Sequence, residues 1–252
     1  YRDQGNSNRG TVRVGTVSGT SITFGSTVLF HSNQVNHVSA TYDSSNNKVV
    51  IAYQDEGNSD YGTAVVGTVS GTSISFGSSA VFESSDCDSL AATYDSTNNK
   101  VVIAYRDDGD SDKGKAVVGT VSGTSISFGT PVVFESSNID TWSLSATFDS
   151  TNNKVVIIYA DFGNSGYGTV INGTVSGTSI SFGSSLVFES ASTGYGAVTY
   201  DSTNDKSVAV YRDSGNSSYG TASVITSDTL SSSLTAENFI GISNGAYTNG
   251  QT

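Results

Sequence analysis

Residues 53–104 read YQDEGNSDYGTAVVGTVSGTSISFGSSAVFE, then a short irregular segment, then LAATYDSTNNKVVIA, and most of this text recurs along the chain. The phrase Y-x-D-x-G-(N/D)-S begins at five tyrosines: Tyr1, Tyr53, Tyr105, Tyr159 and Tyr211. The spacings between them are 52, 52, 54 and 52 residues. A fixed period of this length predicts an array of repeated structural units.

Composition restricts the fold class and the partners. The chain has 252 residues, 28 Gly, one Pro and one Cys, and its apolar residues are mostly Val, Ile, Phe and Tyr. These residues favour strands, so we expect an all-β protein. A net charge of −12 argues against a nucleic-acid partner. No apolar run approaches the roughly 18–20 residues of a membrane helix, so membrane insertion is not expected. The absence of Met, even at position 1, suggests part of a longer product that carries further modules.

Each copy has four predicted strands, which in the second copy are residues 64–69, 73–82, 90–94 and 101–105. Four-stranded units of this length predict a β-propeller with a repeat of about 52 residues. We expect five blades, four complete and one shared by the termini, although four blades with an exit linker or a slice of a longer array would also fit. The repeated phenylalanines, among them Phe24, Phe76 and Phe82, are expected to pack between blades. The predicted units are residues 11–54, 63–106, 115–160 and 169–212, with a partial unit of 221–227 and 1–10; residues 228–252 form a divergent segment that completes the last blade or links to a further module.

Nearly all differences between copies fall between the second and third strands, in residues 31–38, 83–90, 135–144 and 189–198. These segments hold both histidines, the only Cys, the only Trp and the only insertion of the array. In an up-and-down blade they would be loops on the same face as the connections from the fourth strand to the next first strand. Loops on a rigid scaffold often carry recognition. The candidate ligand-binding residues are therefore Trp142, Tyr195, His31, His37, Asp86, Asp88 and Asp140.

Aromatic side chains beside Asp and Asn groups suit carbohydrate, because sugar faces stack on rings and sugar hydroxyls take hydrogen bonds. A packing role for Trp142 at a blade edge is the alternative. Calcium is a second possibility, since oxygen ligands alternate along two connections: Glu56, Asn58 and Asp60, and Asp108, Asp110 and Asp112. Gln4, Asn6, Asn8 and Phe162 at matching positions of other copies favour a solvated turn instead.

Catalysis is not expected. The acids lie in Gly/Ser-rich loops, and no nucleophile–base set is visible. Arg2, Arg106 and Arg212 occupy equivalent positions, so they are interpreted as scaffold. A hydrolase would require a buried pair of carboxylates in a central cleft.

Two resemblances arise from these residues. The phrase at Asp107, Gly109 and Ser111 is similar to the Asp-box of sialidase-type propellers, S-x-D-x-G-x-T-W, but lacks its leading Ser and its Trp; in that family the box is structural. Residues 1–227 also resemble the near-identical GTVSGTSISFG…ATYDSTNNKVVIAY arrays of large uncharacterised surface and phage-fibre-like proteins from marine microbes. That resemblance implies a display module outside the cell or on a virion.

These observations together predict a non-enzymatic extracellular binding or adhesion module that recognises a cell-surface glycan or another surface protein. The alternative is a structural spacer or assembly module of a long adhesin, filament or phage fibre, and a hydrolase-like propeller is a minor alternative.

Overall fold

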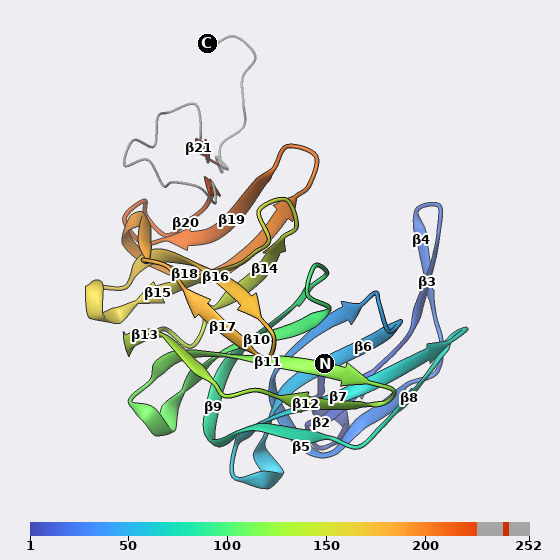
Figure 1. Cartoon of the computed structure of the whole chain (residues 1–252). Coiled ribbons are helices and arrows are strands. Elements are labelled where there is room, and N and C mark those ends of the chain that lie inside the picture. The colour runs from blue at the N-terminus through green and yellow to red at the C-terminus, as the bar shows by residue number, and fades with distance from the viewer. Residues whose placement is uncertain (226–238, 242–252) are drawn as a thin grey trace.

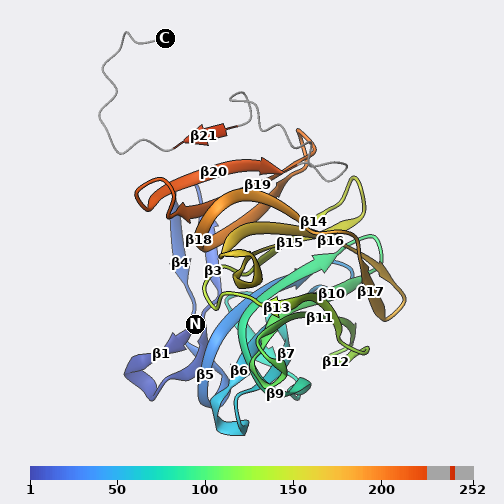
Figure 2. The ribbon, with the colours of Figure 1, turned by 90° about the vertical axis from the view of Figure 1, so that its left-hand side faces the viewer.

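The computed structural model describes residues 1–225 and 239–241 and is built of antiparallel β-strands (Figures 1 and 2). In chain order the strands of the first half are β1 (Arg2–Asp3), β2 (Arg9–Val12), β3 (Gly15–Ser18), β4 (Ser21–Phe24), β5 (Val28–Asp43), β6 (Lys48–Asp55), β7 (Tyr61–Ser70), β8 (Ser73–Phe76), β9 (Ala80–Asp95), β10 (Lys100–Asp107) and β11 (Lys113–Ser122). Those of the second half are β12 (Ser125–Phe128), β13 (Val132–Asn138), β14 (Ser145–Asp149), β15 (Lys154–Asp161), β16 (Tyr167–Ser176), β17 (Ser179–Phe182), β18 (Leu186–Asp201), β19 (Lys206–Asp213), β20 (Tyr219–Ile225) and β21 (Phe239–Gly241).

The helical segments of the described part are single 3₁₀ turns of three residues, which follow the strand that ends in the repeated Asp. They are η1 (Gln4–Asn6), η2 (Glu56–Asn58), η3 (Asp108–Asp110) and η4 (Phe162–Asn164). Within that same part, no helix has the length and apolar character needed to cross a membrane. The prediction of an all-β protein is confirmed.

Turn chemistry sets the ends of the strands. The buried carboxylate of Asp95 accepts hydrogen bonds from the backbone nitrogens of Thr97 (3.0 Å) and Asn98 (2.9 Å). Asn99 then takes the left-handed backbone, at φ 55°, that closes the hairpin between β9 and β10. Gly71, at φ 59°, closes the hairpin between β7 and β8 in the predicted manner.

The long strands β5, β9 and β18 each belong to two sheets. In β9, residues 80–86 pair with β7 and residues 87–95 pair with β10. A four-stranded sheet therefore begins in the middle of a long strand, and a predicted unit such as 63–106 contributes strands to two sheets. We call the repeated groups of strands units: unit 1 (β1–β4 with residues 28–34), unit 2 (residues 35–43, β6–β8 and residues 80–86), unit 3 (residues 87–95 and β10–β13), unit 4 (β14–β17 with residues 186–192) and unit 5 (residues 193–201 and β19–β21). In unit 1 the β3–β4 hairpin is a separate two-stranded sheet.

The units follow one another from the blue strands at the lower right of Figure 1 to the orange strands at the top. Their first strands lie side by side, because β5 contacts β9, β9 contacts β14 and β14 contacts β18. Two hydrogen bonds join these strands: Ala92 N donates to Ser39 Oγ (3.0 Å), and Val198 N donates to Ser145 Oγ (3.1 Å). No strand pairing joins unit 5 to unit 1 among the described residues, so the closed ring of five blades stays a prediction.

The hydrophobic core lies between neighbouring units. One cluster joins units 2 and 3, and others join units 1 and 2, 3 and 4, and 4 and 5. In the cluster between units 2 and 3, the Phe82 ring packs on Tyr105 and Phe128, with centroids 5.3 and 5.6 Å apart. Gly62 is required beside it, since a Cβ there would lie 2.4 Å from the Phe82 ring.

Unit 1 departs from this pattern. Phe24 is 57% exposed, although we expected it to pack between blades, because no unit of the described chain covers the face of the β3–β4 hairpin. Val17 and Ile22 on that hairpin are exposed as well. Their counterparts Val175 and Ile180 in unit 4 are buried against unit 3.

Candidate functional site

The variable segments lie mainly inside long strands. Residues 31–38 belong to β5, 83–90 to β9 and 189–198 to β18. The predicted loops are wrong for these three copies, because the chain stays extended as it passes from one sheet to the next. Only the segment 135–144, which is two residues longer, breaks the strand, leaving residues 139–144 between β13 and β14.

Each long strand has a bulge where it changes partner. The strand register shifts at this point in β5, β9 and β18. One residue of each bulge has left-handed backbone: His37 at φ 43°, Ser89 at φ 49° and Tyr195 at φ 53°. Bulges of this kind redirect side chains and recur beside functional sites. The same repeat position thus presents His37 in unit 2 and Tyr195 in unit 5.

Four side chains gather around Asp88, and together with it they form what we call the central cluster: His37, Gln54, Asp88, Arg106 and Trp142. His37 Nε2 lies 2.9 Å from Asp88 Oδ1, and Gln54 Nε2 donates to the same oxygen at 3.3 Å. Arg106 Nη1 lies 3.3 Å from Asp88 Oδ2. The Trp142 ring lies against His37, with centroids 5.6 Å apart and planes tilted by 43°. Residues from two adjacent units and from the segment 139–144 therefore form one polar and aromatic surface.

The charges of the cluster are coupled. The hydrogen bond from His37 lowers the pKa of Asp88, and the positive charge of Arg106 acts in the same direction. Arg106 also lies 2.9 Å from Asp108 and 2.7 Å from Asp112. Burial, together with the charges of Asp88 and Asp86, raises the pKa of Asp108 to about 6 in spite of Arg106.

The insertion places Trp142 on the surface. The indole is 61% exposed while one side of it rests on His37. Two bonds shape this segment: Asp140 accepts from Ser143 Oγ (2.8 Å), and Asp140 N donates to the carbonyl of Ala160 (3.1 Å). Asp140 therefore positions the Trp142 segment.

Tyr195 lies on the neighbouring segment. Gly196 is so close to Ser143 that a Cβ on it would lie 3.1 Å from the Ser143 carbonyl oxygen. Tyr195 is 64% exposed, and the guanidinium carbon of Arg212 lies 5.1 Å from the centre of its ring. Two exposed aromatic rings, at positions 142 and 195, thus project from adjacent segments.

Of the other candidate residues, Asp86 lies beside the central cluster and His31 does not. Asp86 accepts from Gln54 Nε2 at 3.1 Å. His31 bridges Tyr53 and Asp55: Nδ1 lies 3.1 Å from the Tyr53 hydroxyl, and Nε2 lies 3.0 Å from Asp55. Its place in this network is explained by packing.

The repeat confirms that interpretation of His31. In the other copies a glutamate occupies its position and accepts a hydrogen bond from the equivalent tyrosine. The three pairs are Tyr105 with Glu83 (2.8 Å), Tyr159 with Glu135 (3.0 Å) and Tyr211 with Glu189 (3.1 Å).

These glutamates lie near the strand-end aspartates, and in two of the units the pKa of one carboxyl of the pair is raised. Burial, and then the charge of Glu135, raise the pKa of Asp161. Burial, and then the charge of Asp213, raise the pKa of Glu189. Because such pairs recur from unit to unit around a buried tyrosine, they are explained as part of the scaffold.

The acids considered for calcium have partners within the protein. Asp108 and Asp112 lie on Arg106, Asp110 lies 2.8 Å from Lys113, and Glu56 lies 3.4 Å from Arg2. Asn58 and Asp60 lie in and just after the η2 turn. Across residues 1–225 no group of three or more His, Cys, Asp or Glu side chains is arranged to hold a metal ion. Calcium binding remains a proposal.

Sequence reasoning missed Gln54 and Arg106. Arg106 repeats at positions 2 and 212, which favours a scaffold role. One signal was available, since Gln54 replaces the arginine found at positions 2, 106 and 212. A substitution inside a repeated motif is therefore as informative as a variable segment.

In comparisons with known proteins, the sequence matches no protein-family model and no curated protein. The fold is similar to that of the BP39L lectin from Burkholderia pseudomallei, with a TM-score of 0.66 and 10% sequence identity. The match covers 88% of this chain and 61% of that lectin, so the chain spans less than two thirds of its length. At this identity the similarity concerns the fold.

Proposed function

We propose that this chain is a non-enzymatic glycan-binding module that acts outside the cell, and that its five units are blades of a β-propeller. The observation that carries the proposal is Trp142, which is 61% exposed and yet held in place on His37. An ordered ring with a free face offers a stacking surface for a sugar at little cost in conformational entropy.

Polar groups around Trp142 support a sugar ligand. Asp88 and Arg106 of the central cluster, and Asp86 beside it, offer carboxylate acceptors and guanidinium donors. Sugar hydroxyls both donate and accept hydrogen bonds, so they can use groups of both kinds. The similarity of the fold to that of a lectin also supports this proposal.

A glycan-array screen of the chain tests the proposal. We expect binding to a subset of glycans, and we expect Trp142→Ala to weaken it by about tenfold or more, as for an aromatic residue central to an interface. Tyr42→Ala is a matched control. Tyr42 is also exposed (54%), but it lies next to the C-terminal end of β5 and is not part of the central cluster. Equal binding by the Trp142 variant, or no binding to any glycan, would overturn the proposal. Repeating the screen with EDTA tests whether calcium contributes.

A second candidate function is assembly within a longer adhesin, filament or fibre. In that case the β3–β4 hairpin would contact another surface protein or a further module. The exposed β3–β4 hairpin favours assembly, since Val17, Ile22 and Phe24 form an apolar surface on it. The equivalent residues of unit 4 pack against unit 3. Sedimentation of the purified chain would detect self-association, and loss of that association in Phe24→Ser would place the contact on the hairpin.

A further inference from the structure

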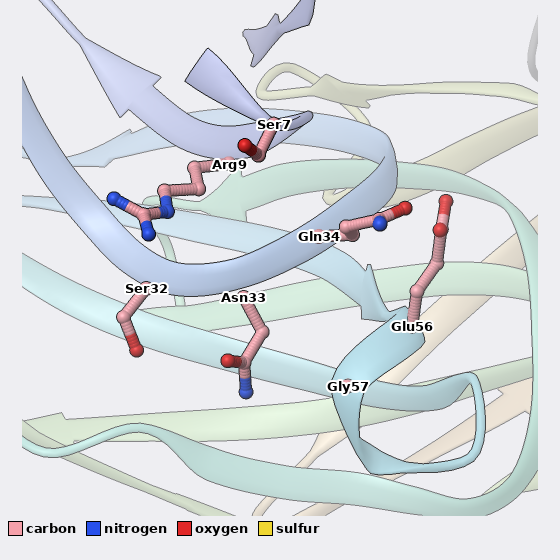
Figure 3. A pocket seen from close by; sticks show the side chains of 7 residues that line it. All are labelled: Ser7, Arg9, Ser32, Asn33, Gln34, Glu56 and Gly57. Atoms are coloured by element: carbon pink, nitrogen blue, oxygen red, sulfur yellow. The ribbon is translucent and has the colours of Figure 1, made fainter.

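A polar groove lies at the junction of units 1 and 2 and shares no residue with the central cluster. Its volume is about 460 Å³. Six side chains line it: Ser7, Arg9, Ser32, Asn33, Gln34 and Glu56 (Figure 3).

A bulge in β5 builds the groove. Arg9 pairs with Gln34, whereas the next residue, Gly10, pairs with His31, so Ser32 and Asn33 have no partner in β2. These two residues are pushed out of the ladder towards solvent. Asn33 lies against the η2 turn, where a Cβ on Gly57 would be 2.5 Å from its amide nitrogen. The groove is thus bounded by β2, by the bulged part of β5 and by the η2 turn.

The side chains of Ser7, Arg9, Ser32, Asn33 and Gln34 make no hydrogen bond or ion pair with other described residues. A guanidinium, two amides and two hydroxyls are therefore free to bind a ligand. Glu56, at the far end of the groove from Arg9 in Figure 3, is paired with Arg2.

The other junctions provide an internal comparison, because there some of the groups equivalent to Asn33, Arg9 and Gln34 are paired. Ser85, the counterpart of Asn33, donates to Asp107 at 2.5 Å. Lys113, the counterpart of Arg9, lies 2.8 Å from Asp110, and Asn138, the counterpart of Gln34, donates to Asp112 at 2.9 Å. At the remaining junctions a tyrosine replaces Arg9. Among the described residues, unit 1 alone combines two unpaired amides, Asn33 and Gln34, with an unpaired arginine.

We propose that this groove binds a sugar residue that carries a carboxylate, an inference that rests on the proposed glycan-binding function. Arg9 pairs with the carboxylate through its planar fork of N–H groups, which matches two carboxylate oxygens. The amides of Asn33 and Gln34 and the two serine hydroxyls bind the sugar hydroxyls. Glu56 repels a carboxylate from the far end and so fixes the orientation of the sugar.

The charge distribution agrees with an anionic ligand. The whole chain carries −12, yet its first 40 residues contain three arginines and a single aspartate. An acidic sugar is repelled by most of the surface and attracted to this unit, which favours the groove over other sites.

The test measures binding of a trisaccharide of galacturonic acid and of its methyl ester by isothermal titration calorimetry at 0.15 M salt. The ester keeps the hydroxyls and removes the charge. We expect the acid to bind at least tenfold more tightly than the ester, a difference in the range expected for hydrogen bonds to a charged group. We expect Arg9→Gln to abolish this difference. Arg13→Gln is the control, because it removes the same charge from an exposed residue of unit 1 that bonds to Thr27 instead.

The outcomes separate this inference from the proposed function. If glycans bind but neither esterification nor Arg9→Gln changes the affinity, the groove is not the carboxylate site and the glycan-binding function stands. If a sulfated, carboxylate-free trisaccharide binds as tightly as the acid, the assignment to carboxylate is wrong. If no glycan binds at all, both proposals fail. Thermal unfolding of each variant confirms that the fold is intact.

Discussion

The isoleucine at the tip of each hairpin offers four copies of one experiment in a single chain. Ile22, Ile74, Ile126 and Ile180 occupy the same repeat position, yet their exposed fractions are 52%, 7%, 6% and 3%. Ile180 packs into the cluster between units 3 and 4. Ile22 projects from a hairpin that no described unit covers. Substitution of each by Ala therefore changes the same atoms in different surroundings.

The expected loss of stability follows from burial. Full burial of an isoleucine side chain stabilises the fold by about 1.5–3 kcal/mol. From their burial, we expect Ile180 to contribute nearly all of this stabilisation and Ile22 about half of it. Removing a buried side chain also leaves a cavity, so buried Ile→Ala changes cost about 2–5 kcal/mol in total. We expect Ile180→Ala to lower the free energy of unfolding by about 3 kcal/mol and Ile22→Ala by about 1 kcal/mol or less.

Urea unfolding followed by tryptophan fluorescence and far-ultraviolet circular dichroism measures both variants. A gap of about 2 kcal/mol between them supports the structure. Equal losses for Ile22→Ala and Ile180→Ala would refute the reasoning, because they would mean that the β3–β4 hairpin is covered in solution. A loss at Ile22 that appears only at high protein concentration would identify a second copy as the cover.

Three further predictions follow from individual side chains. Gly62→Ala should destabilise the fold by about 1–3 kcal/mol in the same assay, because its Cβ would lie 2.4 Å from the Phe82 ring; Gly220→Ala, with no described neighbour within 4 Å, should cost less. Cys87 is fully buried and burial raises its pKa well above the usual range, so iodoacetamide should modify it only after unfolding, as mass spectrometry would detect. The pKa of Asp108 is raised to about 6, so its contribution to stability is present below about pH 4 and is lost as the pH rises through 6; Asp108→Asn should flatten the dependence of the unfolding midpoint on pH between about 4 and 7, and an unchanged slope there would contradict the assignment.

Much of the fold could be predicted from local patterns. The apolar run 64–67 is buried on both faces in β7, and the turn at Gly71 has the expected positive φ, because both features depend on residues close in sequence. The long strands could not be predicted in this way, because they depend on pairing with strands outside the segment. Serine, aspartate and asparagine between residues 83 and 90 favour a loop, but pairing first with β7 and then with β10 keeps this segment extended.

The candidate site was predicted in part. Trp142, His37, Asp86 and Asp88 were singled out because they differ between copies, and the structure brings them together. His31 was chosen by the same criterion, but it replaces a glutamate in the hydrogen bond to a buried tyrosine. Variation between copies identifies a position and does not reveal whether the side chain points to solvent or to a neighbouring strand.

The sequence by itself determined the period, the antiparallel hairpins and the residues that alternate between core and surface, since strand periodicity and turn chemistry act over a few residues. Only the tertiary structure decided that a sheet begins in the middle of β9 and that Trp142 rests on His37. These facts depend on pairing and packing between segments that are separated in the sequence, such as β7, β9 and β10 or residues 37 and 142. No local pattern in the chain specifies which of them will find a partner.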